Sequence, residues 1–473
     1  MPFTTFTALQ PLATRVTRST ALRSVPSRVA MLHYALAPAV TSTAAPPIPK
    51  AKAWGAAYAA SPVASTQPLL DLSQGVPGTA PADSVLAALA KTAGNPDAAK
   101  YGPILGESAM RAALAVELRN LYSVKEEASL LPEDVGITTG CNMAFLVLLM
   151  VLCPPNESSI LLPLPAYFNH AMSLSLQGVT PSYIPCDPAQ GFQPSIDAAR
   201  HILAAEPKIG PNGTPIRPRA IVLTTPNNPT GAVYSPSQLE DWLALARKYE
   251  IPLVLDETYR EFTDAPHTLF DNPTWRESLI SLGSFSKGYR IPGHRLGSIT
   301  ASPTLLEQVA TVCDCMQICP PRPPQLALAP LLPSLRDDLA ESAAALRSRL
   351  AIFAETVANV PGWRVLSSGG FYAYVEFPKE YTGDAARQAL GVDAQSVVGS
   401  EDVGRALAMH GGVLTLPGCF FMPARDSPDW DSVEGAETIK ADRWIRFAIA
   451  NVDDDTVRAL GARLELLNKV MGM

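Results

Sequence analysis

The chain has 473 residues, of which 47% are hydrophobic, so one large or two medium globular domains are expected. Its formal net charge is −7, and residues 1–70 contain no Asp or Glu. The remainder is therefore more acidic still, which argues against nucleic acid as the main partner. The longest apolar run, residues 143–153, is too short to cross a bilayer and predicts a buried helix instead of a membrane anchor.

The N-terminal segment, residues 1–52, is rich in Ser, Thr, Ala and Arg and contains no acidic residue. That composition is typical of a mitochondrial transit peptide, so we predict a mitochondrial protein with a targeting segment. Two alternatives remain open: a disordered tail on a cytoplasmic protein, and a true start at Met31. The seven cysteines form no CxxC pair, and the cysteine cluster at residues 313–319 has no second pair of His or Cys residues with which to bind a metal. We therefore predict reduced thiols and no metal site.

From about residue 130 the chain alternates short apolar runs with helical patterns. Strands are predicted at residues 135–139, 158–164, 180–186, 220–225, 252–257, 278–284 and 296–301, with a helix over 237–250. This alternation predicts an α/β fold with a mostly parallel central sheet flanked by helices. Ligands bind beyond the carboxyl ends of such strands, so the residues that follow each strand are candidates for chemistry.

The last third of the chain predicts a second, smaller α+β domain. Residues 325–360 have the pattern of one long helix that leaves the sheet domain, and strand patterns follow at 363–378 and 442–452. We therefore divide the chain after the N-terminal segment into three parts. They are 53–100, the N-terminal part of the smaller domain; 101–335, the large domain; and 336–473, the C-terminal part of the smaller domain.

Side chains that can bind a ligand follow several of these strands. The turn at Gly140 opens a helix, and the free N–H groups of such a turn attract phosphate. Asp256 ends an apolar strand, where a buried carboxylate needs a cationic partner. Taken singly, these residues also fit a turn, a packed aromatic ring or a surface lysine. The candidates are Gly140, Cys141, Asn142, Tyr167, His170, Asn228, Asp256, Tyr259, Ser284, Ser286, Lys287 and Arg295.

Lys287 suggests which ligand these candidates share. A partly buried lysine beside other cations has a lowered pKa and becomes nucleophilic, and Lys287 is followed closely by Arg290 and Arg295. Pyridoxal 5'-phosphate needs phosphate donors, a stacking ring, a carboxylate at its pyridine nitrogen, polar groups at its phenolic oxygen and a lysine for its aldehyde. This one cofactor accounts for the whole set, so we predict that Lys287 binds it.

The same motifs resemble the class I and II aminotransferases of pyridoxal phosphate fold type I, over roughly residues 69–470. The resemblance rests on SQGVP (73–77), KYGPILG (100–106), PAYFNH (165–170), NNPTG (227–231), DETY (256–259), SFSK…GHRLG (284–297) and RWIRFAIA (443–450). It implies a Schiff base on Lys287, a substrate carboxylate held by Arg446, a substrate-side glycine at Gly75 and a second substrate contact at Asn228. It also implies a large cofactor-binding domain and a homodimer in which Tyr101 reaches the phosphate of the neighbouring subunit.

The resemblance implies a ping-pong transfer of an amino group from an L-amino acid to a 2-oxo acid, with Asp256 as electron-sink partner, Tyr259 beside it and Lys287 as acid and base. A C–S lyase or a cyclopropane-forming synthase of the same fold is the first alternative, and a cofactor-binding regulatory domain is the second. Two positions depart from the family. Arg290 replaces a small residue, and we favour a carboxylate partner for it over a place at the substrate mouth. Gln317 stands where acid-specific members carry an arginine, which weighs against a dicarboxylate substrate.

Overall fold

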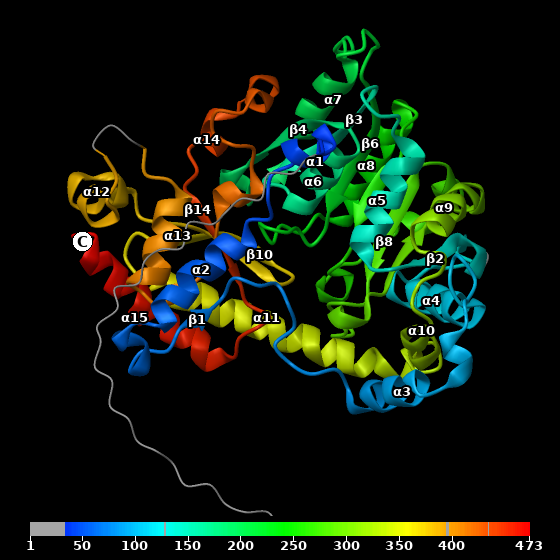
Figure 1. The fold of residues 1–473 in the computed structure, drawn as a ribbon, viewed down its shortest axis with the longest axis horizontal. Helices are drawn as coiled ribbons and strands as arrows, with labels where there is room; N and C mark the ends of the chain where they lie inside the picture. Colours follow the sequence, from blue (N-terminus) through cyan, green and yellow to red (C-terminus); the bar gives the residue numbers. More distant parts are fainter. Residues whose placement is uncertain (1–33, 127–128, 394–396, 434) are drawn as a thin grey trace, which may run out of the picture.

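The computed structural model describes residues 34–126, 129–393, 397–433 and 435–473. Most of the segment predicted to be a transit peptide lies outside these residues. Figure 1 shows two units, a larger one built on a central sheet and a smaller one that contains the C-terminus, with the long helix α11 running beneath both. No helix among the described residues is long and apolar enough to span a membrane.

The central sheet has eight strands in the order β2-β9-β8-β7-β6-β3-β4-β5. Strands β3, β4, β6, β7 and β8 are parallel to their neighbours within this group, whereas β9 is antiparallel to both β8 and β2, and β5 to β4. The predicted, mostly parallel α/β sheet is therefore confirmed. The bounds are β2 Val135–Thr138, β3 Ser158–Leu164, β4 Thr180–Asp187, β5 Gln193–Pro194, β6 Arg217–Thr224, β7 Leu253–Asp256, β8 Leu279–Ser284 and β9 Gly297–Thr300.

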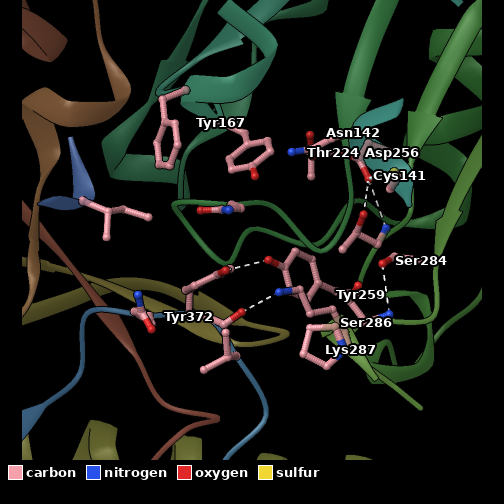
Figure 2. A pocket seen from close by; sticks show the side chains of 18 of the residues that line it. Cys141, Asn142, Tyr167, Thr224, Asp256, Tyr259, Ser284, Ser286, Lys287 and Tyr372 are labelled. Carbon is pink, nitrogen blue, oxygen red and sulfur yellow. Dashed lines mark hydrogen bonds between the residues drawn. The ribbon is translucent and has the colours of Figure 1, made fainter. Parts of the chain in front are cut away.

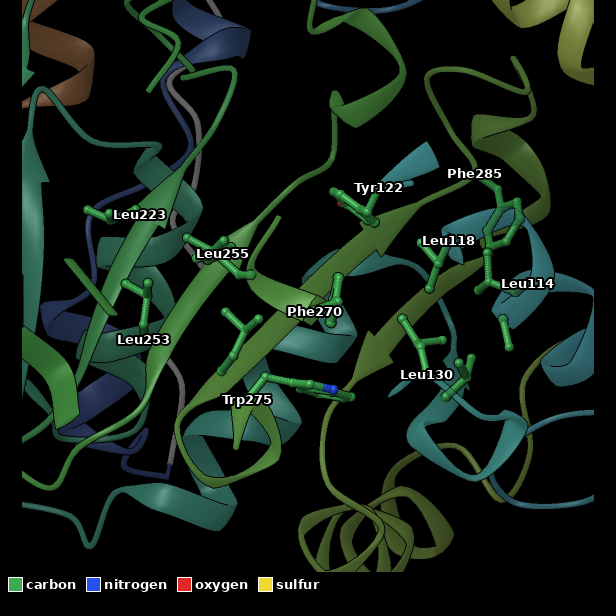
Figure 3. Packing of buried hydrophobic residues seen from close by; sticks show 14 of the residues in the cluster. Leu114, Leu118, Tyr122, Leu130, Leu223, Leu253, Leu255, Phe270, Trp275 and Phe285 are labelled. Carbon is green, nitrogen blue, oxygen red and sulfur yellow. The ribbon is translucent and has the colours of Figure 1, made fainter. Parts of the chain in front are cut away.

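Both faces of this sheet are buried, because successive side chains of a strand point to opposite faces. On β7, Leu253 and Leu255 face one hydrophobic cluster and Val254 faces another. Figure 3 shows the first cluster, to which Tyr122 and Trp275 also belong. The helices of this unit are α3 Asp83–Ala93, α4 Ser108–Leu121, α5 Cys141–Leu152, α6 Phe168–Leu176, α7 Ile196–Ala204, α8 Pro236–Lys248, α9 Pro303–Met316 and α10 Arg322–Leu328.

The smaller unit is built on an antiparallel sheet in the order β10-β11-β14-β13, with a two-stranded parallel pair β1-β12 beside it. The strands are β1 Leu70–Asp71, β10 Arg364–Gly369, β11 Tyr372–Glu376, β12 Val413–Leu414, β13 Leu416–Pro417 and β14 Trp444–Ala448. The helices are α1 Pro38–Ser42, α2 Ile48–Ala59, α11 Arg336–Ala358, α12 Asp384–Leu390, α13 Ser400–Met409, α14 Glu437–Lys440 and α15 Asp454–Val470. Of these, α1 lies against α6 of the larger unit.

The structure differs from the sequence prediction at three places. The long helix predicted over 325–360 is broken between α10 and α11, because Pro330 and Pro333 cannot continue an α-helix. Helix α3 was expected in the smaller unit, but its apolar face, Val85 and Leu89, is buried in the cluster of the larger unit. Residues 34–52, assigned to the N-terminal segment, contain α1 and the start of α2.

Candidate active site

A cavity of about 230 Å³ lies at the carboxyl ends of the parallel strands, as expected for such a sheet. The register there places Thr224 of β6 beside Asp256 of β7, and Asp256 beside Leu282 of β8. Figure 2 shows the resulting ring of side chains. Twelve predicted residues line the cavity, namely Gly75, Cys141, Asn142, Tyr167, Asn228, Asp256, Tyr259, Ser284, Ser286, Lys287, Arg295 and Arg446.

Asp256 is a buried carboxylate held in one orientation. His170 Nε2 lies 3.0 Å from Oδ2, and Thr258 donates both its backbone N–H and its hydroxyl to Oδ1, at 3.1 and 2.7 Å. Burial alone would raise the pKa of Asp256, but the hydrogen bonds from His170 and Thr258 and the charge of His170 hold this pKa below its ordinary value. The carboxylate therefore stays ionised and can stabilise a protonated nitrogen above it. The predicted position of His170 behind Asp256 is confirmed.

Lys287 follows β8 and points into the cavity, where its Nζ donates to the carbonyl oxygen of Gly75 at 2.6 Å. Burial, followed by the positive charges of Arg446 and Arg295, lowers the pKa of Lys287 to about 8. A lysine in this state is partly neutral near pH 7 to 8 and can attack a carbonyl carbon. The lysine expected from the sequence to be nucleophilic thus has the surroundings that the chemistry requires.

Arg295 supplies a positive group at the rim of the cavity, and the backbone at Gly140 packs closely against it. Gly140 precedes α5 with φ = +82°, and a Cβ at this position would lie 2.3 Å from Arg295 Nη2. Arg295 donates to the carbonyl of Pro292 and is solvent-exposed at the cavity rim. Together with the first N–H groups of α5 and the hydroxyls of Ser284 and Ser286, this arginine can hold a phosphate.

Arg446 provides the second positive group, and its side chain is buried at the wall of the cavity. Its Nη1 donates to Oδ1 of Asn228 at 2.9 Å, and its Nη2 donates to the carbonyl of Ser73. Its Nε has no hydrogen-bond partner, and none of the ion pairs between described residues includes it. A buried arginine without a carboxylate is costly, so the arrangement favours an anionic ligand.

Asn228 owes its position to the NNPTG turn. Asn227 accepts hydrogen bonds from the N–H and the hydroxyl of Thr230, at 3.1 and 2.9 Å, which closes the turn. Gly231 has φ = +73°, and a Cβ there would lie 2.5 Å from the carbonyl oxygen of Tyr372. The turn therefore packs directly against β11 and holds the Asn228 side chain against Arg446.

Tyr372 is a lining residue that the sequence prediction missed. Its hydroxyl lies 2.5 Å from that of Tyr259, and its ring centroid lies 4.6 Å from the guanidinium carbon of Arg446. It comes from β11 of the smaller unit, and no local motif marks it. Tyr167, predicted as the stacking ring, lines the same cavity and contacts the ring of His170 edge-on.

Three predicted residues lie outside the set that lines the cavity. Gly140 and His170 support the cavity from behind, through Arg295 and Asp256 respectively. Tyr101 does not line it and is 79% exposed on this chain.

The two positions that depart from the family both have partners within the chain. Arg290 pairs with Asp338 of α11, with Nη2 within 2.6 Å of both carboxylate oxygens, and donates to Ser342 as well. The favoured reading of Arg290, a carboxylate partner, is thus confirmed. Gln317 accepts a hydrogen bond from the N–H of Thr139. Within the described residues no group of three or more His, Cys, Asp or Glu side chains could hold a metal ion.

The arginines of the cavity that have no carboxylate partner indicate that the lining residues fit pyridoxal phosphate. Arg295 and Arg446 are two arginines outside the ion pairs of the described chain, and both line the same cavity as Asp256 and Lys287. A ligand that satisfies all four has a phosphate, a protonated ring nitrogen and an aldehyde, and it leaves the second arginine for a substrate carboxylate.

Comparison with known proteins also indicates an aminotransferase. The sequence model of aminotransferase class I and II matches residues 67–464. The aspartate aminotransferase of Sulfurisphaera tokodaii is 25% identical over 68% of this chain and 74% of its own length. The alanine aminotransferase of Mycobacterium bovis is 30% identical over 54% of this chain and 60% of its own length.

Solved structures share the fold over nearly the whole chain. The aspartate aminotransferase from Rhizobium meliloti superposes with a TM-score of 0.74 at 19% identity, covering 92% of this chain and 99% of that one. An aspartate aminotransferase double mutant of Thermus thermophilus gives a TM-score of 0.72 at 20% identity, covering 92% of this chain and 100% of that one. At these identities the likeness establishes the fold alone.

Proposed function

This chain belongs to the class I and II aminotransferase family and is a transaminase, and on that basis we propose that it binds pyridoxal 5'-phosphate at Lys287 and transfers an amino group from an L-amino acid to a 2-oxo acid. Members of the family generally depend on this cofactor. The observation that carries the proposal is one cavity lined by Lys287, Asp256, Arg295 and Arg446.

When bound, pyridoxal phosphate supplies an aldehyde that joins the amino group and a ring that accepts the electron pair released at Cα. The residues of the chain do the rest. Arg446 binds the substrate carboxylate bidentately and so fixes the direction of the Cα–H bond. Lys287, whose pKa is lowered to about 8, removes the proton from the substrate Cα and can deliver it to the aldehyde carbon of the cofactor. The ionised Asp256 keeps the ring nitrogen protonated.

We infer that the enzyme acts as a homodimer, with Tyr101 directed at the partner subunit. The support is that Tyr101 lies outside the cavity of its own chain with its ring largely exposed, although aromatic side chains are usually buried. We also propose that the residues before Tyr34 direct the protein to mitochondria, on their composition. Fusing residues 1–33 to a fluorescent protein tests the second proposal, and sedimentation of the purified chain tests the first.

The function is tested by a half-reaction without any 2-oxo acid. We would load a chain that starts at residue 34 with pyridoxal phosphate, add single amino acids, and follow the cofactor absorbance together with ammonia. Stoichiometric conversion to the amino form of the cofactor, with no ammonia, supports a transaminase. Steady release of ammonia and oxo acid, with the cofactor unchanged, would make the chain a lyase. Lys287→Ala should abolish the conversion, whereas Lys91→Ala, an exposed lysine on α3, should leave it unchanged.

A further inference from the structure

One segment that lines the cavity comes from a part of the chain that its composition assigned to targeting. Residues 38–59, here called the N-terminal strap, comprise α1, α2 and the linker between them. Ile48, the first residue of α2, lines the same cavity as Lys287 and Arg446. The strap is therefore part of the folded enzyme, and Ile48 is close enough to contact a substrate.

The strap is fixed to both units of the fold. On the larger unit, Thr43 donates its hydroxyl to Ser175 of α6 at 2.8 Å. On the smaller unit, Lys50 lies 2.5 Å from a carboxylate oxygen of Glu401 on α13, and Ala51 is fully buried. Figure 1 shows α1 beside α6 and α2 beside α13. Because Ile48 lies between these two attachments, its position is held from both sides.

Ile48 belongs to an apolar wall next to the arginine expected to hold the substrate carboxylate. Ile48, Val76 and Phe168 line the cavity, and Ile48 and Phe168 pack against one hydrophobic cluster that contains Phe421. The centroid of the Phe421 ring lies 5.8 Å from the centroid of the Phe168 ring. The same Phe421 centroid lies 4.9 Å from the guanidinium carbon of Arg446. A ligand held by Arg446 is therefore bordered by apolar side chains.

Within one chain, the charged groups of the cavity leave no partner for a charged substrate side chain. Among the described residues that line it, the cations are Lys287, Arg295 and Arg446, each of which already has a place in the reaction, and the carboxylate is Asp256, which is held by His170. A second carboxylate, or an ammonium group, would lose its water at the apolar wall without gaining an ion pair from this chain, which is unfavourable.

Resting on the proposed function, we propose that the N-terminal strap builds the side-chain pocket of the enzyme and that Ile48 makes this pocket selective for L-amino acids with apolar side chains. The substrate carboxylate binds Arg446, and its side chain lies against Ile48, Val76 and Phe168. A chain shortened to residue 53 would lose this side chain while retaining every residue assigned to cofactor binding.

The test compares donors across variants of the strap. Half-reaction rates would be measured for leucine, phenylalanine, alanine, aspartate and lysine with the parent, with Ile48→Ala and with Val40→Ala, a control at a 55% exposed position of the same strap. The parent should favour leucine or phenylalanine over aspartate and lysine. Loss of side-chain contacts in an apolar pocket lowers discrimination by about 10- to 200-fold, so Ile48→Ala should slow leucine by at least about 10-fold and alanine far less. Val40→Ala should change neither.

A binding measurement separates this inference from the function on which it rests. Calorimetric titration with 4-methylpentanoate and with succinate needs no turnover, and the parent should bind the apolar monocarboxylate more tightly, a preference that Ile48→Ala should reduce. If no amino acid converts the cofactor, the proposed function fails. If conversion occurs but aspartate is the fastest donor, or Ile48→Ala slows alanine and leucine equally, the function stands and the selectivity inference is refuted.

Discussion

At Gly140 the backbone has φ = +82°, and an added Cβ would lie 2.3 Å from Nη2 of Arg295. Gly140→Ala therefore has two separate effects. A non-glycine residue in this backbone region costs about 1–3 kcal/mol of folding stability. In addition, the guanidinium of Arg295 must move away from the position in which it can bind a phosphate.

The second effect determines the expected magnitude. A hydrogen bond to a charged group contributes about 1.5–3 kcal/mol, which corresponds to about 10- to 100-fold in affinity. Gly140→Ala should therefore weaken pyridoxal phosphate binding by about that factor. The affinity would be measured by titrating the cofactor-free protein and following absorbance, and the stability by thermal unfolding of the same cofactor-free protein.

Gly213 offers a matched control. Its φ is +79°, so it meets a similar backbone restriction, but no atom lies within 4 Å of the position of an added Cβ. Gly213→Ala should lower the unfolding temperature without changing cofactor affinity. If Gly140→Ala binds pyridoxal phosphate as tightly as the parent, Arg295 does not hold the phosphate in the way its packing suggests, and the cofactor assignment at this end of the cavity is wrong.

Three further outcomes are expected. Burial raises the pKa of Glu261 to about 7 from an ordinary value of 4.5, so the folded chain binds a proton that the unfolded chain releases between these values. Glu261→Gln should therefore leave the unfolding free energy unchanged below pH 4.5 and raise it by up to about 3 kcal/mol above pH 7; equal effects at both pH values would contradict this. Arg446→Met removes a charge that lowers the pKa of Lys287, so the pKa of Lys287 should rise in the cofactor-free protein. This pKa would be read from the pH dependence of lysine methylation by mass spectrometry, and an unchanged value would refute the coupling. Arg290→Met and Asp338→Asn should show a coupling of about 1 kcal/mol in a double-mutant cycle of thermal unfolding, because the pair is only partly exposed, with donor preference unchanged; additive effects would mean that the pair contributes nothing.

The sequence predicted most of the larger unit and most of its cavity, for a physical reason. Parallel strands buried on both faces are continuous apolar runs, and polar residues that follow such runs must lie at one edge of the sheet. Asp256 and Lys287 were found in this way, since each follows its strand directly. Their positions depend on local sequence and on the common direction of the strands.

What the sequence could not predict depends on contacts between distant segments. Tyr372 reaches the cavity because β11 of the smaller unit packs against the turn at Gly231, and nothing near Tyr372 in the sequence signals this. Ile48 was hidden for a different reason. Its surroundings have the composition of a targeting segment, and composition does not reveal that α2 packs on α13. The break before α11, in contrast, could have been predicted from the sequence, because Pro330 and Pro333 lie within the predicted helix.

The distance along the chain between Ile48 and Arg446 has a consequence for biosynthesis. The smaller unit joins both ends of the polypeptide, since β1 pairs with β12 through Leu70 and Val413. Proteins begin to fold from the N-terminus as they emerge from the ribosome. Helix α2 of the strap packs on α13, so this contact can form only after more than 300 residues of later sequence have been translated. The cavity itself is complete only after β14, the strand that carries Arg446, has been translated.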